Sequence, residues 1–205
     1  MSAAARFITL EGVDGAGKST HLQFIADAVA AASGRRAIVT REPGGTDLAE
    51  HLRRTILEEP MDALAETLLI FAARAHHVRN VIRPALESGS WVVCDRFVDA
   101  TYAYQAAGKG VPPEFVERLS AAAHPGLAPD RTLVFDCGYE VARKRLAGSG
   151  KKLDRFERED AAFFERVRGA YLARARAEPG RMRIIDAAAD LPTIRKSLEH
   201  ALAFT

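Results

Sequence analysis

The sequence predicts an α/β fold of three layers, with a five-stranded parallel sheet flanked by helices. Five short β-like runs recur along the chain, at residues 6–10, 36–40, 91–95, 131–136 and 181–186. Segments with helical periodicity lie between them, at 18–32, 62–87, 112–123, 139–147, 156–177 and 191–203. Strands that alternate with helices favour a parallel sheet covered on both faces.

The chain is long enough for one large domain, which we expect to span residues 1–205. Its 205 residues are 48% hydrophobic, and no repeat, low-complexity tract or interdomain linker interrupts them. The stretch "AGSGKK" is flexible and basic, and it predicts a mobile lid loop at about 147–157.

Composition argues against several function classes. A net charge of +2 gives no excess field for nucleic acid or a membrane surface. No apolar run approaches the roughly 18 residues of a membrane span, and the first residues lack a signal-peptide core, so we expect a cytoplasmic protein. Cys94 and Cys137 each end an apolar run and are expected to be buried, reduced thiols; a disulfide between them is the alternative.

In a parallel sheet of this type, ligands bind beyond the carboxyl ends of the strands. The segments that follow the first four runs are "EGVDGAGKST", "REPGGT", "DRF" and "DCG". All four carry charge and two carry arginine, which predicts a polar cleft that binds anions.

The first of these segments predicts a phosphate-binding loop. Gly12, Gly17, Lys18 and Ser19 fit the pattern GxxxxGKS/T between a strand and a helix. Glycines let successive N–H groups point at a phosphate, and the helix N-terminus adds its positive dipole end. The predicted nucleotide-binding residues are Gly12, Val13, Asp14, Gly15, Ala16, Gly17, Lys18, Ser19 and Thr20, with Lys18 at the outer phosphates and Ser19 at magnesium. The alternative is a chance match in a glycine-rich turn.

Further cations and an aromatic side chain predict a second anionic substrate. Arg41 follows the second strand and Arg96 follows the third. Phe71 and Arg74 are i and i+3 on one predicted helix, so a planar base could stack on Phe71 while Arg74 bonds its edge. Taken alone, Phe71 is more often a core residue and a single arginine is usually solvated.

Five motifs, "EGVDGAGKST", "TREPGGT", "FAAR", "CDRFVDATYAYQ" and "KKLDRFE", together resemble the thymidylate kinase family, and its bacterial branch in particular. The resemblance runs from about Phe7 to Asp186. It implies the fold of phosphate-loop nucleoside monophosphate kinases, transfer of a phosphoryl group from ATP to dTMP with Mg²⁺, and a homodimer.

The resemblance also implies roles for individual residues of the second site. Arg41 and Arg96 match the arginines that hold the dTMP phosphate, and Asp95 matches a residue near the metal. Phe71 matches the ring that stacks on thymine, and Arg74 the side chain that bonds its O4.

Four other positions complete the expected nucleotide contacts. Tyr104 matches an aromatic residue that crowds the sugar 2′ position, and Arg145 an arginine that packs on adenine. Thr101 is assigned to the thymine N3 side and Gln105 to the lining of the acceptor site. Ala100 departs from the family pattern, which commonly has serine there.

Asp14 is unexpected in a loop that binds phosphate. Family members use this carboxylate to hold the 3′-hydroxyl of the nucleotide sugar, and a carboxylate accepts such a hydrogen bond well. Asp14 is therefore expected to point away from the phosphates, toward the acceptor, with magnesium as a further contact. The alternative is an aspartate that caps the following turn.

A cation must also reach the transferring phosphate. Some family members place an arginine inside the phosphate loop, whereas this sequence has Gly15 and Ala16 there. The lid residues Lys151, Lys152 and Arg155 are the catalytic candidates, together with Lys18, Arg96 and Asp14; a merely solvated basic loop is the alternative. Two other functions stay open at this point: a kinase for a different small acceptor, and a phosphate-loop switch protein without a second substrate.

Overall fold

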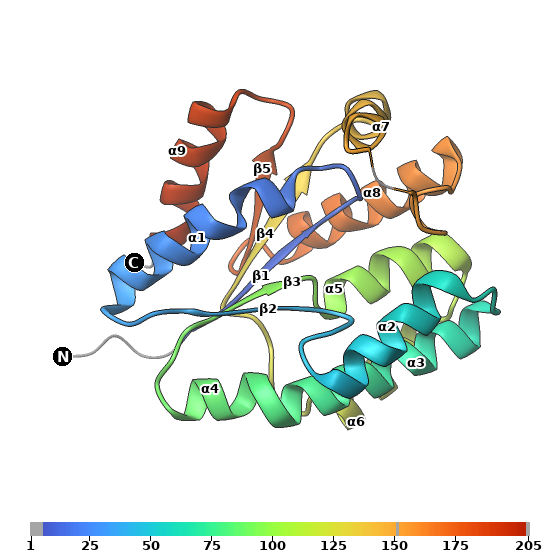
Figure 1. Ribbon diagram of the computed structural model, residues 1–205, viewed down its shortest axis with the longest axis horizontal. Coiled ribbons are helices and arrows are strands. Elements are labelled where there is room, and N and C mark those ends of the chain that lie inside the picture. The colour runs from blue at the N-terminus through green and yellow to red at the C-terminus, as the bar shows by residue number, and fades with distance from the viewer. Residues whose placement is uncertain (1–5, 151, 204–205) are drawn as a thin grey trace.

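Five parallel strands form one sheet in the computed structural model, which describes residues 6–150 and 152–203 (Figure 1). The strands are β1 (Phe7–Gly12), β2 (Ile38–Arg41), β3 (Val92–Asp95), β4 (Arg131–Asp136) and β5 (Met182–Asp186). Their order across the sheet is β2-β3-β1-β4-β5, and every neighbouring pair is parallel. The predicted fold class and all five predicted strands are confirmed.

Helices cover both faces of the sheet. They are α1 (Lys18–Ser33), α2 (Asp47–Glu58), α3 (Ala63–His77), α4 (Arg83–Glu87), α5 (Val98–Thr101), α6 (Pro113–Ala123), α7 (Tyr139–Gly148), α8 (Ala161–Ala177) and α9 (Leu191–Leu202). Two segments are π-helical: η1 (Val78–Ile82) joins α3 to α4, and η2 (Tyr102–Gly108) continues α5. Helices α1 and α9 pack together beside the sheet, while α5, η2 and α8 pack on its other side (Figure 1).

The helix predicted over residues 62–87 is confirmed as one continuous helical segment, in which η1 widens the helix between α3 and α4. The helix predicted from residue 156 begins later, because the Asp160 side chain accepts a hydrogen bond from the Phe163 amide at 2.7 Å and caps α8. Sequence reasoning did not predict α2 or the helical segment formed by α5 and η2.

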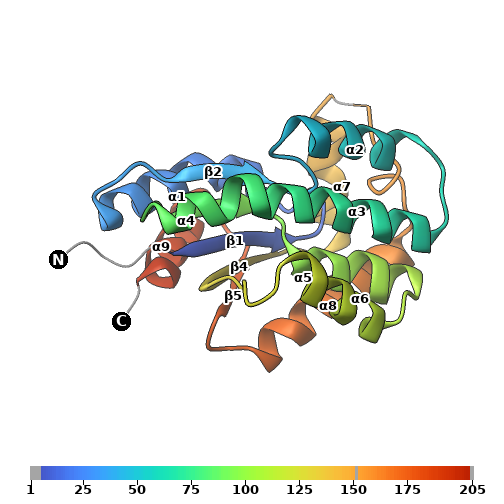
Figure 2. The same cartoon turned by 90° about the horizontal axis from the view of Figure 1, so that it is seen from below.

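The strand register brings the polar segments to one edge of the sheet. Asp95 at the end of β3 lies opposite both Leu10 of β1 and Arg41 of β2. Figure 2 shows α2 and α3 extending past the carboxyl ends of the strands, so that they wall this edge. The cleft predicted from the strand ends therefore has strands as its floor and helices as its sides.

The core on both faces is apolar and contains the two cysteines. Cys94 and Cys137 are buried and form no disulfide, as expected. Burial raises the pKa of the Cys94 thiol, which keeps it protonated. Among the described residues, no helix combines the length and apolarity needed to span a bilayer.

Candidate active site

The loop between β1 and α1 has a backbone that only glycine accommodates at its first position. Gly12, Gly15 and Gly17 have φ angles of 128°, 80° and 91°. A Cβ at Gly12 would lie 2.3 Å from the carbonyl oxygen of Phe135 on the neighbouring strand. The glycines thus let the chain pass close to β4 and enter α1 at Lys18.

Lys18 is held inside this loop. Its ammonium donates to the carbonyl oxygens of Gly12 and Val13 at 3.1 and 3.3 Å. Burial and the nearby positive charge of Arg96 lower the pKa of Lys18. Gly12 and Val13 thereby position the lysine, although neither lines the cavity that the loop borders.

That cavity, here called the loop cavity, has a volume of about 550 Å³. It is lined by Asp14, the rest of the loop through Thr20, Arg41, Arg53, Asp95, Arg96 and Arg145, and by apolar residues of α9. Arg145 is fixed by hydrogen bonds to the carbonyl oxygens of Ala187, at 2.8 Å, and Ala16, at 3.3 Å. The loop cavity is large enough for a nucleotide and carries cations along one wall.

A second, narrower cavity, here called the slot, adjoins it with a volume of about 90 Å³. Six of the predicted substrate residues line the slot: Asp14, Arg74, Arg96, Thr101, Tyr104 and Gln105. Glu42, Arg53, Ile56, Ile70 and Phe156 also line it and were not predicted. Asp14, Arg53 and Arg96 border both cavities, so whatever binds in one lies beside whatever binds in the other.

Asp14 turns from the phosphate loop toward the slot. One carboxylate oxygen accepts from Arg96 Nη2 at 2.6 Å, and the other accepts from the Tyr104 hydroxyl at 2.8 Å. Burial alone would raise the pKa of Asp14, but the charges of Arg96 and Lys18 hold it below its usual value. An ionised carboxylate has about four lone-pair sites, so Asp14 keeps acceptor capacity on the slot side.

Arg96 has a strained backbone conformation, and buried hydrogen-bond partners hold its guanidinium in place. It is the one residue other than glycine with a positive φ among those described, at 69°. Its Nη1 donates to the carbonyl oxygen of Gly12 at 2.7 Å and to the Tyr171 hydroxyl at 3.1 Å. Strain of this kind, about 1–2 kcal/mol for a residue with a side chain, is typical of functional sites.

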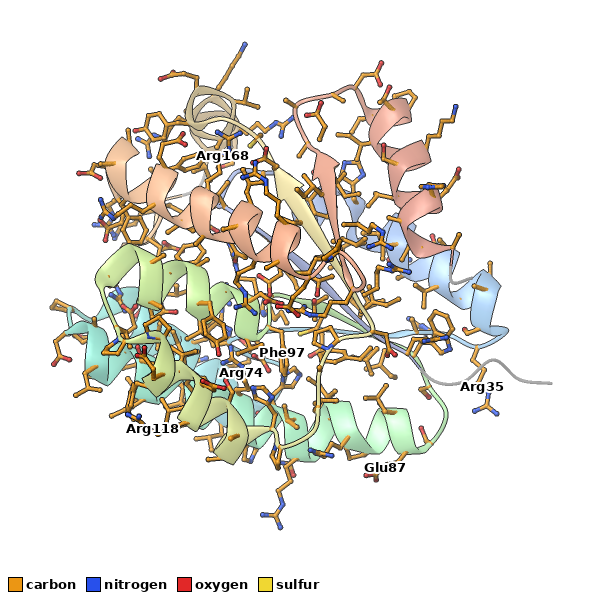
Figure 3. The ribbon with its side chains drawn as sticks, turned by 180° about the vertical axis from the view of Figure 1, so that it is seen from behind. Arg35, Arg74, Glu87, Phe97, Arg118 and Arg168 are labelled. Carbon is orange, nitrogen blue, oxygen red and sulfur yellow. The ribbon has the colours of Figure 1, made fainter. Side chains whose placement is uncertain are left out.

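Arg74 lines the slot as a buried cation, and one of its guanidinium nitrogens, Nη1, remains available to a ligand. Its Nε donates to Glu42 at 2.6 Å, and its Nη2 donates to the Phe97 carbonyl at 3.2 Å and the Thr101 hydroxyl at 3.1 Å. Its Nη1 is buried and has no hydrogen-bond partner within the described parts of the chain. Figure 3 shows Arg74 and Phe97 together in the interior, whereas Arg35, Glu87 and Arg118 lie at the periphery. A buried, unpaired N–H beside a slot is a ready donor for a ligand.

Phe71 does not occupy the position that the sequence suggested. Its side chain is buried in the core, with the His124 ring parallel to it at 6.5 Å and the Arg74 guanidinium 4.7 Å from its centroid. Ile70 lines the slot instead. Helical geometry allows either residue to lie beside Arg74, since i+3 and i+4 neighbours share its face. Packing decides between them, because His124 and Phe97 cover the Phe71 side chain and leave Ile70 at the slot.

Arginines gather where the two cavities meet. Arg41 lines the loop cavity and pairs with Glu50 at 2.9 Å, while Arg53 of α2 donates to the Pro43 carbonyl at 2.9 Å. Burial and the like charges of Arg41 and Arg96 lower the pKa of Arg53. Cations that repel one another in a cleft favour a bound anion.

The expected metal residues, Asp95 and Ser19, both line the loop cavity. In residues 6–150 and 152–203, no cluster of three or more histidine, cysteine or carboxylate side chains could hold a metal by itself. Oδ1 of Asp95, however, is buried without a hydrogen-bond partner in this part of the chain. This set suits Mg²⁺, which usually takes one or two protein ligands together with phosphate oxygens and water.

The two lid cations that the structure describes, Lys152 and Arg155, do not line the loop cavity. Arg155 lines neither cavity; its Nη1 lies 2.5 Å from Glu66, a fully buried carboxylate of α3, and its Nε donates to the Ile56 carbonyl. The expectation that Arg155 faces the transferring phosphate is therefore not met in this structure, because the buried charge of Glu66 attracts it. Lys152 is exposed, and Lys151 lies outside the described residues.

Comparison with known proteins decides the family. A family profile described as thymidylate kinase matches residues 10–198. The chain belongs to the thymidylate kinase family. It is 54% identical over 202 residues to the thymidylate kinase of Bordetella petrii, an alignment that covers 98% of this chain and 97% of that one. The thymidylate kinase of Methylobacillus flagellatus is 53% identical over 193 residues, with 94% of each chain covered.

A solved structure from the same family agrees on the fold. The crystal structure of thymidylate kinase from Ehrlichia chaffeensis superposes with a TM-score of 0.79 at 28% identity, and covers 98% of this chain and 99% of that one. The resemblance seen in the five sequence motifs is thus confirmed, and the thymidylate kinase family fold extends across the chain.

Proposed function

We propose that this protein transfers the γ-phosphoryl group of ATP to dTMP, giving dTDP and ADP. The observation that carries the proposal is the shared wall of the two cavities, formed by Asp14, Glu42, Arg53, Arg96 and Asp154. A hydrolase needs one nucleotide site, whereas a kinase must hold a second substrate next to the first. Membership of the thymidylate kinase family supports dTMP as that second substrate.

The loop cavity is assigned to ATP. Backbone amides of the loop and the ammonium of Lys18 bind the phosphates, and Arg145 packs on the adenine. Ser19 and Asp95 would hold Mg²⁺, which neutralises charge on the phosphate oxygens. The unpaired Oδ1 of Asp95 supports this assignment.

The slot is assigned to the thymine and sugar of dTMP. The free Nη1 edge of Arg74 donates to the base carbonyl, Thr101 lies beside the N3 side, and Ile70 covers a ring face. Asp14 accepts from the 3′-hydroxyl, and Tyr104 leaves little room for a 2′ substituent. The room for the thymine methyl contributes about 1–3 kcal/mol to discrimination against dUMP.

The dTMP phosphate belongs where Arg41, Arg53 and Arg96 converge. One of its oxygens attacks the γ-phosphorus, a new P–O bond forms, and the bond from that phosphorus to the bridging oxygen breaks. The electron pair of the broken bond leaves with ADP. No side-chain nucleophile is needed, since alignment and charge neutralisation supply the catalysis.

We also propose a single cytoplasmic domain that forms a homodimer. Leu64 and Leu68 of α3, which are i and i+4, are 53% and 45% exposed, and Leu48 of the adjacent α2 is 49% exposed. An apolar face of this kind supports contact between two copies. Sedimentation at micromolar concentration tests it: a monomer at all concentrations would contradict the dimer.

The experiment that tests the activity is a coupled assay of ADP release with ATP and magnesium. It offers dTMP, dUMP, dCMP, dGMP, UMP or no acceptor. Turnover mainly with dTMP is the expected result. Preference for another acceptor would make the protein a different small-molecule kinase, and ADP release indifferent to every acceptor would remove the second substrate.

A further inference from the structure

The Glu66 carboxylate is inaccessible to solvent and lines neither the loop cavity nor the slot. It lies on α3, one turn before Ile70 and two turns before Arg74, with its side chain fully buried. Oε1 accepts from Gln105 Nε2 at 2.7 Å. Oε2 accepts from Lys109 Nζ at 2.8 Å and pairs with Arg155 Nη1 at 2.5 Å.

The partners of Glu66 belong to separate parts of the chain. Gln105 lies on η2 and lines the slot, whereas Lys109 follows the end of η2. Arg155 lies on the segment between α7 and α8, and its Nε also donates to the carbonyl of Ile56, a slot residue of α2. One buried carboxylate thus joins α3 and η2 to a segment that has no strand or long helix of its own.

The neighbours of Arg155 on that segment reach the slot. Asp154 and Phe156 both line it, and Asp154 also borders the loop cavity. The charged groups of Lys109 and Arg155 lie 4.5 and 4.6 Å from the centroid of the Phe156 ring, which in turn meets Tyr104 edge-on at 5.8 Å. The contact with Glu66 therefore fixes the part of the wall that faces Tyr104.

We propose that Glu66 is a positioning residue that holds the segment Asp154–Phe156 against the slot through Arg155. The inference rests on the proposed function, because it gives this wall the task of enclosing the acceptor nucleotide. Glu66 does not touch the reacting atoms and acts through Arg155, Phe156 and Gln105.

The energetics favour one position of the segment. Removing one partner from a buried ion pair is unfavourable, because the remaining charge is desolvated and less well compensated. If Arg155 moves away, Glu66 keeps Lys109 and Gln105 but loses the donor that also bonds α2. The segment is thereby biased toward the slot, where it excludes water that would compete with the acceptor phosphate.

The test compares Glu66→Gln, Arg155→Met and the double variant with Asp136→Asn as the matched control. Asp136 also forms a two-bond pair, with Arg168 at 2.7 and 3.0 Å, but it lies outside the linings of the loop cavity and the slot. The readouts are KM for dTMP, KM for ATP, kcat, and hydrogen exchange of the amides in residues 152–158 of the protein without nucleotide.

We expect KM for dTMP to rise about tenfold in both single variants, with a smaller rise of about twofold in KM for ATP, because Asp154 of the held segment also borders the loop cavity. Exchange at residues 152–158 should become about tenfold faster. The double variant should resemble the singles, because both remove the same contact. Asp136→Asn should change none of these quantities, whatever it does to the melting temperature.

Other outcomes overturn the inference. A lower melting temperature without a change in exchange at 152–158 would make Glu66 a structural residue only. Equal rises in KM for both nucleotides, or fully additive effects in the double variant, would also contradict it. If the wild-type protein does not phosphorylate dTMP, the proposed function fails, while the exchange measurement still decides whether Glu66 holds the segment. If Glu66→Gln does not fold, Arg155→Met still removes the same contact, and it does so at a half-buried loop residue that is less critical to folding.

Discussion

Truncating Ile70 should weaken dTMP binding, whereas shortening its neighbour Phe71 should weaken the fold. Ile70→Ala removes three carbons from the wall of the slot. At about 0.8 kcal/mol for each buried carbon the complete loss is about 2 kcal/mol, and roughly half of it belongs to the face that meets the ligand. The expected change is about 1 kcal/mol, which is roughly a fivefold rise in KM for dTMP.

Phe71 supplies the matched comparison because it is the next residue on the same helix and is 4% exposed. Phe71→Leu should leave KM for dTMP unchanged and lower the stability by about 1–2 kcal/mol, or about 3–6 °C in melting temperature. Steady-state kinetics with either nucleotide varied, together with thermal unfolding, measure both effects. A rise in KM for dTMP in Phe71→Leu and not in Ile70→Ala would refute the assignment of the slot face and restore Phe71 as the stacking ring.

Three further predictions test the rest of the site. Lys18→Met should lower kcat by about 100-fold or more, since it removes a donor from the developing phosphate charge, and the melting curve should stay cooperative; near-normal turnover would exclude its role. Arg53→Ala should raise KM for dTMP about tenfold while Arg54→Ala, on the exposed side of α2, changes it little, and equal effects would place Arg53 outside the anion site. Burial and the charge of Asp99 raise the pKa of Glu11 from 4.5 to about 8, so the folded state holds a proton that the unfolded chain has lost. Stability should therefore fall as pH rises from about 5 to 8, and Glu11→Gln should gain about 3–5 °C over wild type for each pH unit of that range in pH-resolved thermal unfolding; a gap independent of pH would contradict the shift.

The sheet and the phosphate loop could be predicted because their signals are local. Each strand is a short apolar run, and the loop pattern from Gly12 to Ser19 stands directly between a strand and a helix. Helix α2 had a local signal that was missed. Thr46 accepts a hydrogen bond from the Ala49 amide at 3.2 Å as an N-cap, and Ala49 and Ile56 form its buried stripe. Without α2, Arg53 could not be placed at the anion site.

Other features depend on contacts that no local pattern contains. Ile70 and Phe71 are adjacent in sequence, but one residue turns the helix by about 100°, so tertiary packing alone decides which faces the slot. His124 and Phe97 come from distant segments and close the face that Phe71 occupies. Similarly, the pairing of Arg155 with Glu66 joins a loop to a helix far away in the chain. A basic loop predicts cations but not their partners.

The carboxylate in the phosphate loop has a physical reason in the structure. Arg96 and Lys18 stabilise its charge, and the positive φ of Arg96 directs the guanidinium between Asp14 and the Gly12 carbonyl. One charge network therefore borders both cavities. Asp14→Ala should then raise KM for ATP and for dTMP together, because it frees Arg96 and Tyr104 at the shared wall, whereas Arg74→Ala should affect dTMP alone. Steady-state kinetics on the two variants measure both KM values. If the two sites were independent, Asp14→Ala would change the KM for ATP or the KM for dTMP, but not both.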